Sequence, residues 1–154
     1  MKELIFFEKQ KFTQSFWMWL LVVLASIAGP VISFLSISKI DLYILIMSLL
    51  IFIFMYLCEL RVKLSKEGIH YQFFPMHLKS HTIKFDEIDR FEELKYSPIG
   101  DYGGWGIRHR FKGKAYNVSG NRGVKIYLKS GRHILFGSQR SKEFEQVLNQ
   151  FMKQ

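Results

Sequence analysis

The stretch Leu60–Phe74, LRVKLSKEGIHYQFF, decides how the second half of the chain folds. On both sides of Ser65–Gly68 its apolar and polar residues alternate, which is the pattern of two β-strands joined by a tight turn. Glycine at the end of that segment tolerates the positive φ that such turns require. The stretch therefore predicts a hairpin with Ile69, Tyr71 and Phe73 on one face.

The same period of two residues continues along the chain as far as Phe136. It predicts strands at Ile83–Phe85, Phe91–Tyr96, Trp105–Phe111, Tyr116–Val118, Val124–Leu128 and His133–Phe136, with turns at Asp86–Asp89, Ser119–Gly123 and Ser130–Gly131. We therefore expect six or seven short antiparallel strands that form a bent sheet or a partly open barrel.

The C-terminus changes to the helical period. Phe144, Val147, Leu148 and Phe151 are spaced as one stripe of an amphipathic helix, and Ser138 or Ser141 can cap it. The expected fold class of residues 60–154 is thus α+β, an antiparallel β-barrel or bent sheet capped by a C-terminal α-helix.

Two apolar runs precede this domain. Residues 16–37 and 42–58 contain no Asp, Glu, Lys, Arg or His, and the first run would reach roughly 33 Å as a helix, enough for a hydrocarbon core of about 30 Å. We expect a transmembrane two-helix hairpin over residues 16–59. A cleaved signal peptide is disfavoured because the apolar run continues past the small residues 26–28, and two buried core helices are disfavoured because neither run has a polar face.

Basic residues flank this hairpin on both sides. Lys2, Lys9 and Lys11 precede it, and Arg61 and Lys63 follow it. The positive-inside rule then predicts that residues 1–15 and residues 60–154 are both cytoplasmic.

Two segments carry a family resemblance. Leu64–Tyr71, LSKEGIHY, followed by Thr82–Phe91, TIKFDEIDRF, resembles the opening of bacterial pleckstrin-homology-like domains, in which a strand, an E-G-[ILV] turn and an I-x-[FL]-x-[ED]-I segment recur after a membrane hairpin. The later stretches GWGIR, NVSGNRGV and ILFGSQR resemble a subgroup of small bacterial membrane proteins with that arrangement. The likeness covers nearly the whole chain and implies a PH-like fold in the bacterial inner membrane.

The resemblance implies a binding or scaffolding module. In lipid-binding eukaryotic members a basic K-x(n)-R-x-R signature on the first hairpin holds inositol phosphates, but this chain has only Lys63 and Lys66 near its first turn. Its R-x-R, at Arg108 and Arg110, comes later. Phosphoinositide recognition is therefore not carried over.

The charge of the chain points to an anionic partner. The formal net charge is +9, and no acidic residue occurs between Tyr102 and Lys142. The candidate residues for an anionic surface are Arg108, Arg110, Lys112, Lys114, Lys125 and Lys129, which we expect on one strand face and its neighbour. They predict a non-enzymatic protein that engages anionic lipid headgroups or a membrane-proximal protein, with an unidentified partner or a homo-oligomer and no nucleic acid. A merely solvated basic surface remains the open alternative.

The glycine tract before these residues suggests a nucleotide loop at first sight. However, Gly103, Gly104, Trp105 and Gly106 do not match G-x-G-x-x-G, and no P-loop lysine and serine follow. We interpret them as a structural turn or bulge, with no cofactor bound.

No pattern of residues indicates catalysis or metal binding. Cys58 is the single cysteine, His77 and His81 lack partners at metal-ligand spacing, and the acidic run Asp86–Glu93 is typical of a solvated face. We therefore predict no catalytic, cofactor or metal site. The alternatives are a subunit that packs through its membrane hairpin and a membrane-linked enzyme whose acidic run and histidines meet in a cleft.

Overall fold

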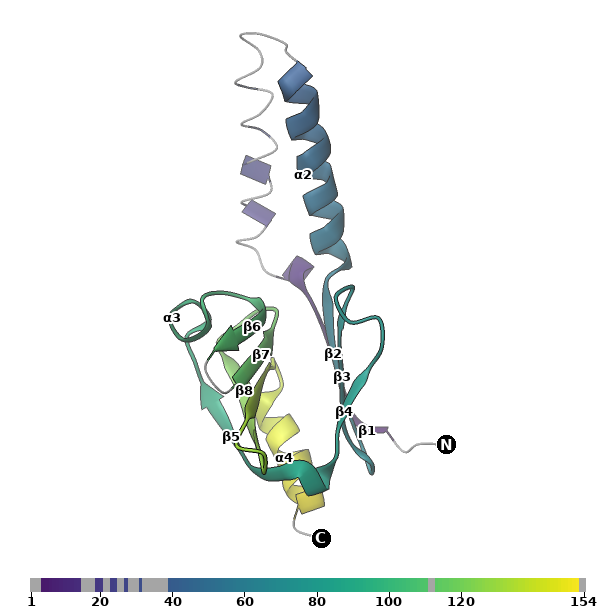
Figure 1. Cartoon of the computed structure of the whole chain (residues 1–154), viewed down its shortest axis with the longest axis vertical. Coiled ribbons are helices and arrows are strands. Elements are labelled where there is room, and N and C mark those ends of the chain that lie inside the picture. The colour runs from purple at the N-terminus through teal and green to yellow at the C-terminus, as the bar shows by residue number, and fades with distance from the viewer. Residues whose placement is uncertain are drawn as a thin grey trace. The chain divides into compact units, whose positions relative to one another are not determined.

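The structure is a computed structural model that describes residues 4–14, 19–20, 23–24, 27, 31, 39–110 and 113–152. The chain divides into two compact units. The first joins Met1–Gln10 to Glu59–Gln154, and the second is Lys11–Cys58. The first unit holds both β-sheets (Figure 1).

A four-stranded sheet contains the hairpin from which the fold was predicted. Its order is β1–β2–β3–β4, with β1 at Leu4–Lys11, β2 at Glu59–Ser65, β3 at Gly68–Phe74 and β4 at His81–Ile83. Strands β2 and β3 are antiparallel and meet at the pair Ser65 and Gly68. Gly68 has φ of 144°, and an added Cβ there would lie 2.2 Å from the carbonyl oxygen of Ile83. The turn therefore requires glycine because of both its backbone conformation and the approach of β4.

The second sheet has five strands in the order β5–β8–β9–β7–β6. The strands are β5 (Ile88–Lys95), β6 (Gly106–Arg110), β7 (Gly113–Asn117), β8 (Arg122–Leu128) and β9 (His133–Gly137). The expectation of wholly antiparallel strands is wrong at one place, because β7 and β9 are parallel. Strand β9 returns from β8 through a tight hairpin and inserts between β8 and β7, which run in opposite directions, so it must be parallel to one of them.

Aromatic side chains fill the space between the two sheets. Helix α4 (Ser141–Met152) buries Phe144, Val147 and Leu148, the stripe that the helical spacing predicts. The Phe144 ring lies 5.1 Å from the ring of Phe6 in β1 and 6.3 Å from that of Phe136 in β9. The core of the first unit is therefore built jointly by β1, β9 and α4, and Figure 1 shows the two sheets on either side of the helix.

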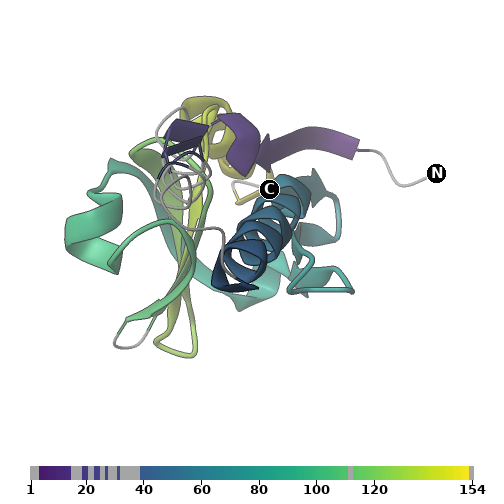
Figure 2. The same ribbon diagram turned by 90° about the horizontal axis from the view of Figure 1, so that it is seen from above.

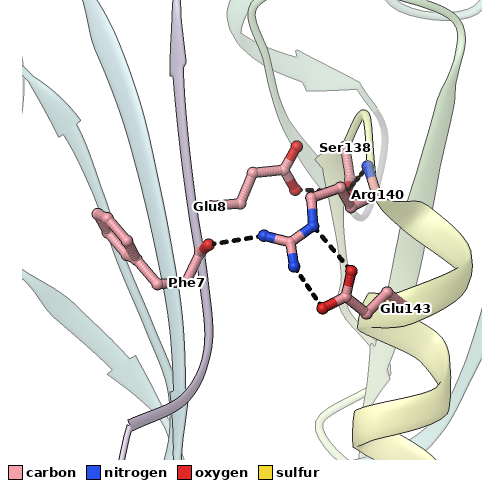
Figure 3. Close-up of polar contacts among 5 residues, drawn as sticks. All are labelled: Phe7, Glu8, Ser138, Arg140 and Glu143. Carbon is pink, nitrogen blue, oxygen red and sulfur yellow. Dashed lines mark hydrogen bonds and ion pairs between the residues drawn. The ribbon is translucent and has the colours of Figure 1, made fainter.

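A buried polar network attaches β1 to the start of α4 (Figure 3). The Glu8 carboxylate accepts hydrogen bonds from the Ser138 hydroxyl (2.5 Å) and from the backbone N–H of Gln139 (2.8 Å). Arg140 donates to the carbonyl oxygen of Phe7 (3.2 Å) and pairs with Glu143. Because a negative charge near a helix N-terminus is favourable, Glu8 both satisfies backbone groups and stabilises the helix.

Two short helices connect the strands of this unit. The 3-10 helix η2 (Phe85–Glu87) precedes β5, and α3 (Pro98–Tyr102) precedes β6. In Figure 2, α4, in yellow, lies beside β1, in purple, whereas the turn between β8 and β9 projects from the opposite side of the unit. Helix α4 therefore covers the side of the space between the sheets that lies next to β1, and it does not cover the side next to the turn between β8 and β9.

The second unit contains the 3-10 helix η1 (Phe12–Gln14) and helix α2 (Lys39–Leu57). Trp19 ties its beginning to α2, because its Nε1 donates to the carbonyl oxygen of Thr13 (2.7 Å) and its ring lies 5.1 Å from that of Phe52. Cys58 ends the unit as a buried free thiol whose pKa is raised by burial.

The predicted transmembrane hairpin is wrong. Among the described residues, no helix is both long and apolar enough to cross a membrane. Helix α2 begins with Lys39 and Asp41, so its apolar part starts at Leu42 and reaches roughly 24 Å, less than a hydrocarbon core of about 30 Å. Most of the other predicted span, residues 16–37, lies outside the described residues.

Three further predictions depended on that hairpin and are corrected with it. They are the membrane-anchored fold class, the two-span integral membrane partnership, and the localisation in a bacterial inner membrane with both termini cytoplasmic. In their place the structure has an α+β arrangement of two sheets with α2, α3 and α4 in the described part of the chain.

Candidate functional site on the five-stranded sheet

The register of the five-stranded sheet divides the predicted basic residues between its two faces. Arg108 pairs with Ala115, Ala115 with Leu135, and Leu135 with Lys125, so these residues share one face. We call it the outer face, because the opposite face carries Tyr116 and Phe136, which pack against Tyr71 of the four-stranded sheet.

The other candidate residues lie elsewhere. Lys114 pairs with His109 and Ile134 and therefore belongs to the inner face. Arg110 occupies an outer-face register position opposite Gly113, and Lys112 lies outside the described residues. Lys129 is exposed just after β8, where its backbone N–H donates to the carbonyl oxygen of Glu87 (2.9 Å).

A tyrosine between two cations forms the centre of the basic cluster on the outer face. The Arg90 guanidinium lies 4.0 Å and the Lys125 Nζ 4.9 Å from the centroid of the Tyr127 ring. The Tyr127 hydroxyl donates to Glu92 (2.6 Å), and the His133 ring lies 6.0 Å from that of Tyr127. Cation–π contacts and this hydrogen bond hold the side chains in place, so the cluster is preorganised.

An apolar strip separates this cluster from Arg108. Tyr96, Ala115 and Leu135 are buried together, with Leu94 and Tyr102 packed against them. Strands β8 and β6 are not neighbours, since β9 and β7 lie between them, so the basic residues on β8 and β6 stand about 14 Å apart at about 4.8 Å per strand. The expectation that they occupy adjacent strands is therefore wrong.

The glycine tract ends α3 and begins β6. Gly103 has φ of 71° and donates its N–H to the carbonyl oxygen of Ile99 (2.9 Å), which closes the helix in the left-handed conformation. Gly104 and Gly106 also have positive φ, of 124° and 107°. A Cβ on Gly104 would lie 3.0 Å from Nη2 of Arg108, so the missing side chain leaves room for the guanidinium. The tract thus places Arg108 at the edge of the outer face.

The start of α3 shows why this segment is helical at all. The Ser97 hydroxyl accepts from the N–H of Gly100 (3.0 Å), and the Asp101 carboxylate accepts from the N–H of Ser97 (2.7 Å). This reciprocal capping, with Pro98 at the first helical position, stabilises a single helical turn. Tyr102 at its end packs on the apolar strip.

The acidic run beside β5 is distributed over both faces of the sheet. Glu92 bonds to Tyr127 on the outer face, whereas Glu93 accepts from Arg122 and from the Ser141 hydroxyl on the side of α4. Within the described residues, no group of three or more His, Cys, Asp or Glu side chains is placed to hold a metal ion. The hypothesis of an enzyme stays a prediction.

Two residues of the outer-face cluster were missed from the sequence. In the sequence, Arg90 appears only within the Thr82–Phe91 stretch of the family resemblance, and Tyr127 only as one position of an alternating strand. The alternation placed Tyr127 on the same face as Lys125, which was a usable signal. Nothing local indicates that Arg90 pairs with Tyr127, because that contact depends on the pairing of β5 with β8.

Comparison with known proteins adds no relative. No family model, no curated protein and no solved structure matches the chain. The resemblance to bacterial pleckstrin-homology-like domains therefore stays a prediction.

Proposed function

We propose that this protein is a non-enzymatic binding module that engages an acidic surface of a partner protein through the outer face of its five-stranded sheet. The observation that carries the proposal is the placement of Tyr127 between Arg90 and Lys125. Tyrosine and arginine are enriched at the centres of protein interfaces, and side chains that are already ordered lose little entropy on binding.

The charges of this face suit carboxylates. Arg90, Lys125 and Arg108 face outward, and Glu92 is engaged by the Tyr127 hydroxyl. A guanidinium can bind a carboxylate through two parallel hydrogen bonds. This geometry favours a partner that carries separate acidic side chains. Leu94 and Tyr102, which are only partly buried beside the basic groups, favour a protein partner over a uniformly charged surface, because they offer apolar contacts that only a shaped partner would use.

The test uses the full chain and immobilised poly-L-glutamate, with anionic phosphatidylglycerol vesicles as a second arm. Arg90→Glu combined with Lys125→Glu should weaken capture by poly-L-glutamate at least about tenfold. The matched control, Lys84→Glu with Lys142→Glu, changes the net charge equally at exposed positions outside the cluster and should stay within about twofold.

Three outcomes would overturn the proposal. The first is an equal loss in both double variants, which would show that only net charge matters. The second is capture by the vesicles without capture by poly-L-glutamate, which would assign the face to lipid. The third is no effect of the Arg90 and Lys125 substitutions on capture.

A further inference from the structure

A second feature lies at one end of the same sheet, where β6 and β8 end and β7 and β9 begin. An open cleft of about 690 Å³ is lined by residues from both sheets and from η2, among them Tyr71, Glu87, His109, Lys114, Arg132 and His133. No residue of α4 contributes to this lining. The cleft thus occupies a part of the space between the sheets that the helix does not fill.

The polar groups of the cleft favour an anion. Lys114 and Arg132 are both exposed to solvent, and Glu87 is the carboxylate among the lining residues. His109 and His133 add two imidazoles, each able to donate a hydrogen bond. The pKa of His133 is lowered by burial and by the charge of Lys125, so its ring is neutral near pH 7 and can gain a proton beside an anion.

One wall of the cleft is aromatic and held in place from several sides. The Tyr71 ring stacks on His81 with centroids 5.5 Å apart, and it lies 5.0 Å from both Tyr116 and Phe136. His77 lies 5.6 Å from Tyr116 and 4.6 Å from His81. Because these neighbours restrict the ring of Tyr71, the part of it that lines the cleft can contact a planar group without first being ordered.

The basic groups and the aromatic wall are close enough to act on one molecule. Tyr71, Lys114 and Arg132 all line the same cleft. The pKa of nearby His77 is lowered first by burial and then by the charges of His81 and Lys114. Burial also raises the pKa of Tyr71, so its hydroxyl stays protonated and neutral.

A glycine makes room for the imidazole of His133 beside β7. Gly113 is the parallel-strand partner of His133, and an added Cβ at position 113 would lie 2.0 Å from His133 Nε2. The ring therefore occupies the space that a side chain on β7 would fill. This placement follows from the insertion of β9 beside β7.

From this geometry we infer that the cleft binds a small organic anion, with a carboxylate or phosphate group held by Lys114 and Arg132 and a planar body packed on Tyr71. Its volume lies within the range of about 300–1,000 Å³ that small-molecule sites occupy. The inference does not rest on the proposed protein partner, because Lys114 and Arg132 are not among the residues Arg90, Lys125 and Tyr127 that carry that proposal.

The experiment titrates the full chain with phenyl phosphate, benzoate, phenol and inorganic phosphate, and follows the histidine and tyrosine ring signals by NMR. We expect the two aromatic anions to shift the signals of Tyr71, His109 and His133, and phenol to bind at least about tenfold more weakly. Tighter binding of phenyl phosphate than of benzoate would assign the site to phosphates, and the reverse order would assign it to carboxylates.

Variants then locate the binding. Lys114→Gln with Arg132→Gln should weaken the preferred aromatic anion at least about tenfold, whereas the control Lys95→Gln with Lys142→Gln should stay within about twofold. The inference is overturned if neither aromatic anion shifts these signals at a concentration of about 10 mM. Such a concentration would still reveal a dissociation constant roughly a hundredfold larger than that of a typical ligand. It is also overturned if the two double variants lose affinity equally, or if inorganic phosphate binds as tightly as phenyl phosphate.

Discussion

The space between the two sheets differs between the side that α4 covers and the side where the cleft opens. On the covered side, Phe6 and Phe144 stack and the Glu8 carboxylate is fully engaged by partners at the start of the helix. On the open side, Tyr71 stacks on the His81 ring and lines the cleft together with Lys114. Phe136 marks the boundary, because its ring contacts both Phe144 and Tyr71.

The difference shows what a covering helix imposes on its neighbours. A charge away from water is costly unless it is paired, and the buried Glu8 carboxylate on the covered side accordingly has hydrogen-bond partners. Where solvent enters, lysine, arginine and histidine can remain, and they are available to a ligand. The covered side should therefore control stability, and the open side should tolerate substitution.

The largest effect is expected at the centre of the covered side. Phe144→Ala removes a fully buried ring that contacts Phe6 and Phe136, and should lower the free energy of unfolding by about 3–5 kcal/mol. Chemical denaturation followed by circular dichroism measures this loss. Phe7→Ala, at a residue that is 39% exposed, is the control and should cost less than about 1 kcal/mol. Similar losses in both variants would mean that α4 does not close this side.

The next effect concerns the polar network at the start of α4. Glu8→Gln replaces an acceptor of the Ser138 hydroxyl and the Gln139 N–H with an amide that brings donors of its own, and should cost about 1–3 kcal/mol. Glu143→Gln alters an exposed pair with Arg140 and should cost less than about 1 kcal/mol. Chemical denaturation of both variants at pH 7 measures the two losses of unfolding free energy. A larger loss from Glu143→Gln than from Glu8→Gln would contradict the prediction.

Gly123 on β8 and Gly113 on β7 allow a comparison of how well each strand tolerates an added side chain. At Gly123, which pairs with Gly137 just before Ser138, an added Cβ would lie 2.4 Å from the carbonyl oxygen of Phe136, so backbone must move and Gly123→Ala should cost about 1–3 kcal/mol. At Gly113 the nearest atoms to an added Cβ belong to the His133 ring, a side chain that can rotate away, so Gly113→Ala should cost less than about 1 kcal/mol. Thermal unfolding compares the two, and equal shifts in melting temperature would contradict the distinction.

The smallest effect is a pH dependence at the start of β2. Burial of the Glu59 carboxyl opposes its ionisation, but hydrogen bonds and charges from Lys9 and Arg61 outweigh burial and lower its pKa below the ordinary 4.5. Because the folded pKa is the lower one, the stabilisation is complete above the unfolded pKa and is lost as the pH falls through the folded pKa. The unfolding free energy should thus fall more for the wild type than for Glu59→Gln between about pH 5 and about pH 3. Parallel pH profiles of the two proteins would refute this.

The local elements of the first unit could be predicted well from periodicity. The alternation from Leu60 to Phe74 appears as β2 and β3, and the stripe from Phe144 to Phe151 falls within α4. Strand β1 was not predicted, because two of its buried residues, Glu8 and Gln10, are polar and have partners more than 120 residues away in the chain. An apolar pattern cannot reveal a strand that is held by such partners.

The site could be predicted only in part. The basic residues were recognised, but Lys114 lies on the opposite face from Arg108, and the strands of Arg108 and Lys125 are separated by two others. The apolar runs at residues 16–37 and 42–58 predicted a membrane hairpin, but α2 opens with Lys39 and Asp41, and no described helix is long and apolar enough to span a bilayer.

By itself, the sequence determined most of the strands after residue 59, the place of the final helix, and that the domain is basic, whereas it missed α3 and placed the start of β5 too late. These properties depend on neighbours a few residues apart, which a single sequence displays directly. Only the tertiary structure decided that β9 inserts between β8 and β7, that β1 joins the first unit, and which basic groups face outward or into the cleft. Strand order and side-chain juxtaposition arise from contacts between distant segments, and local periodicity carries no information about which strands will pair.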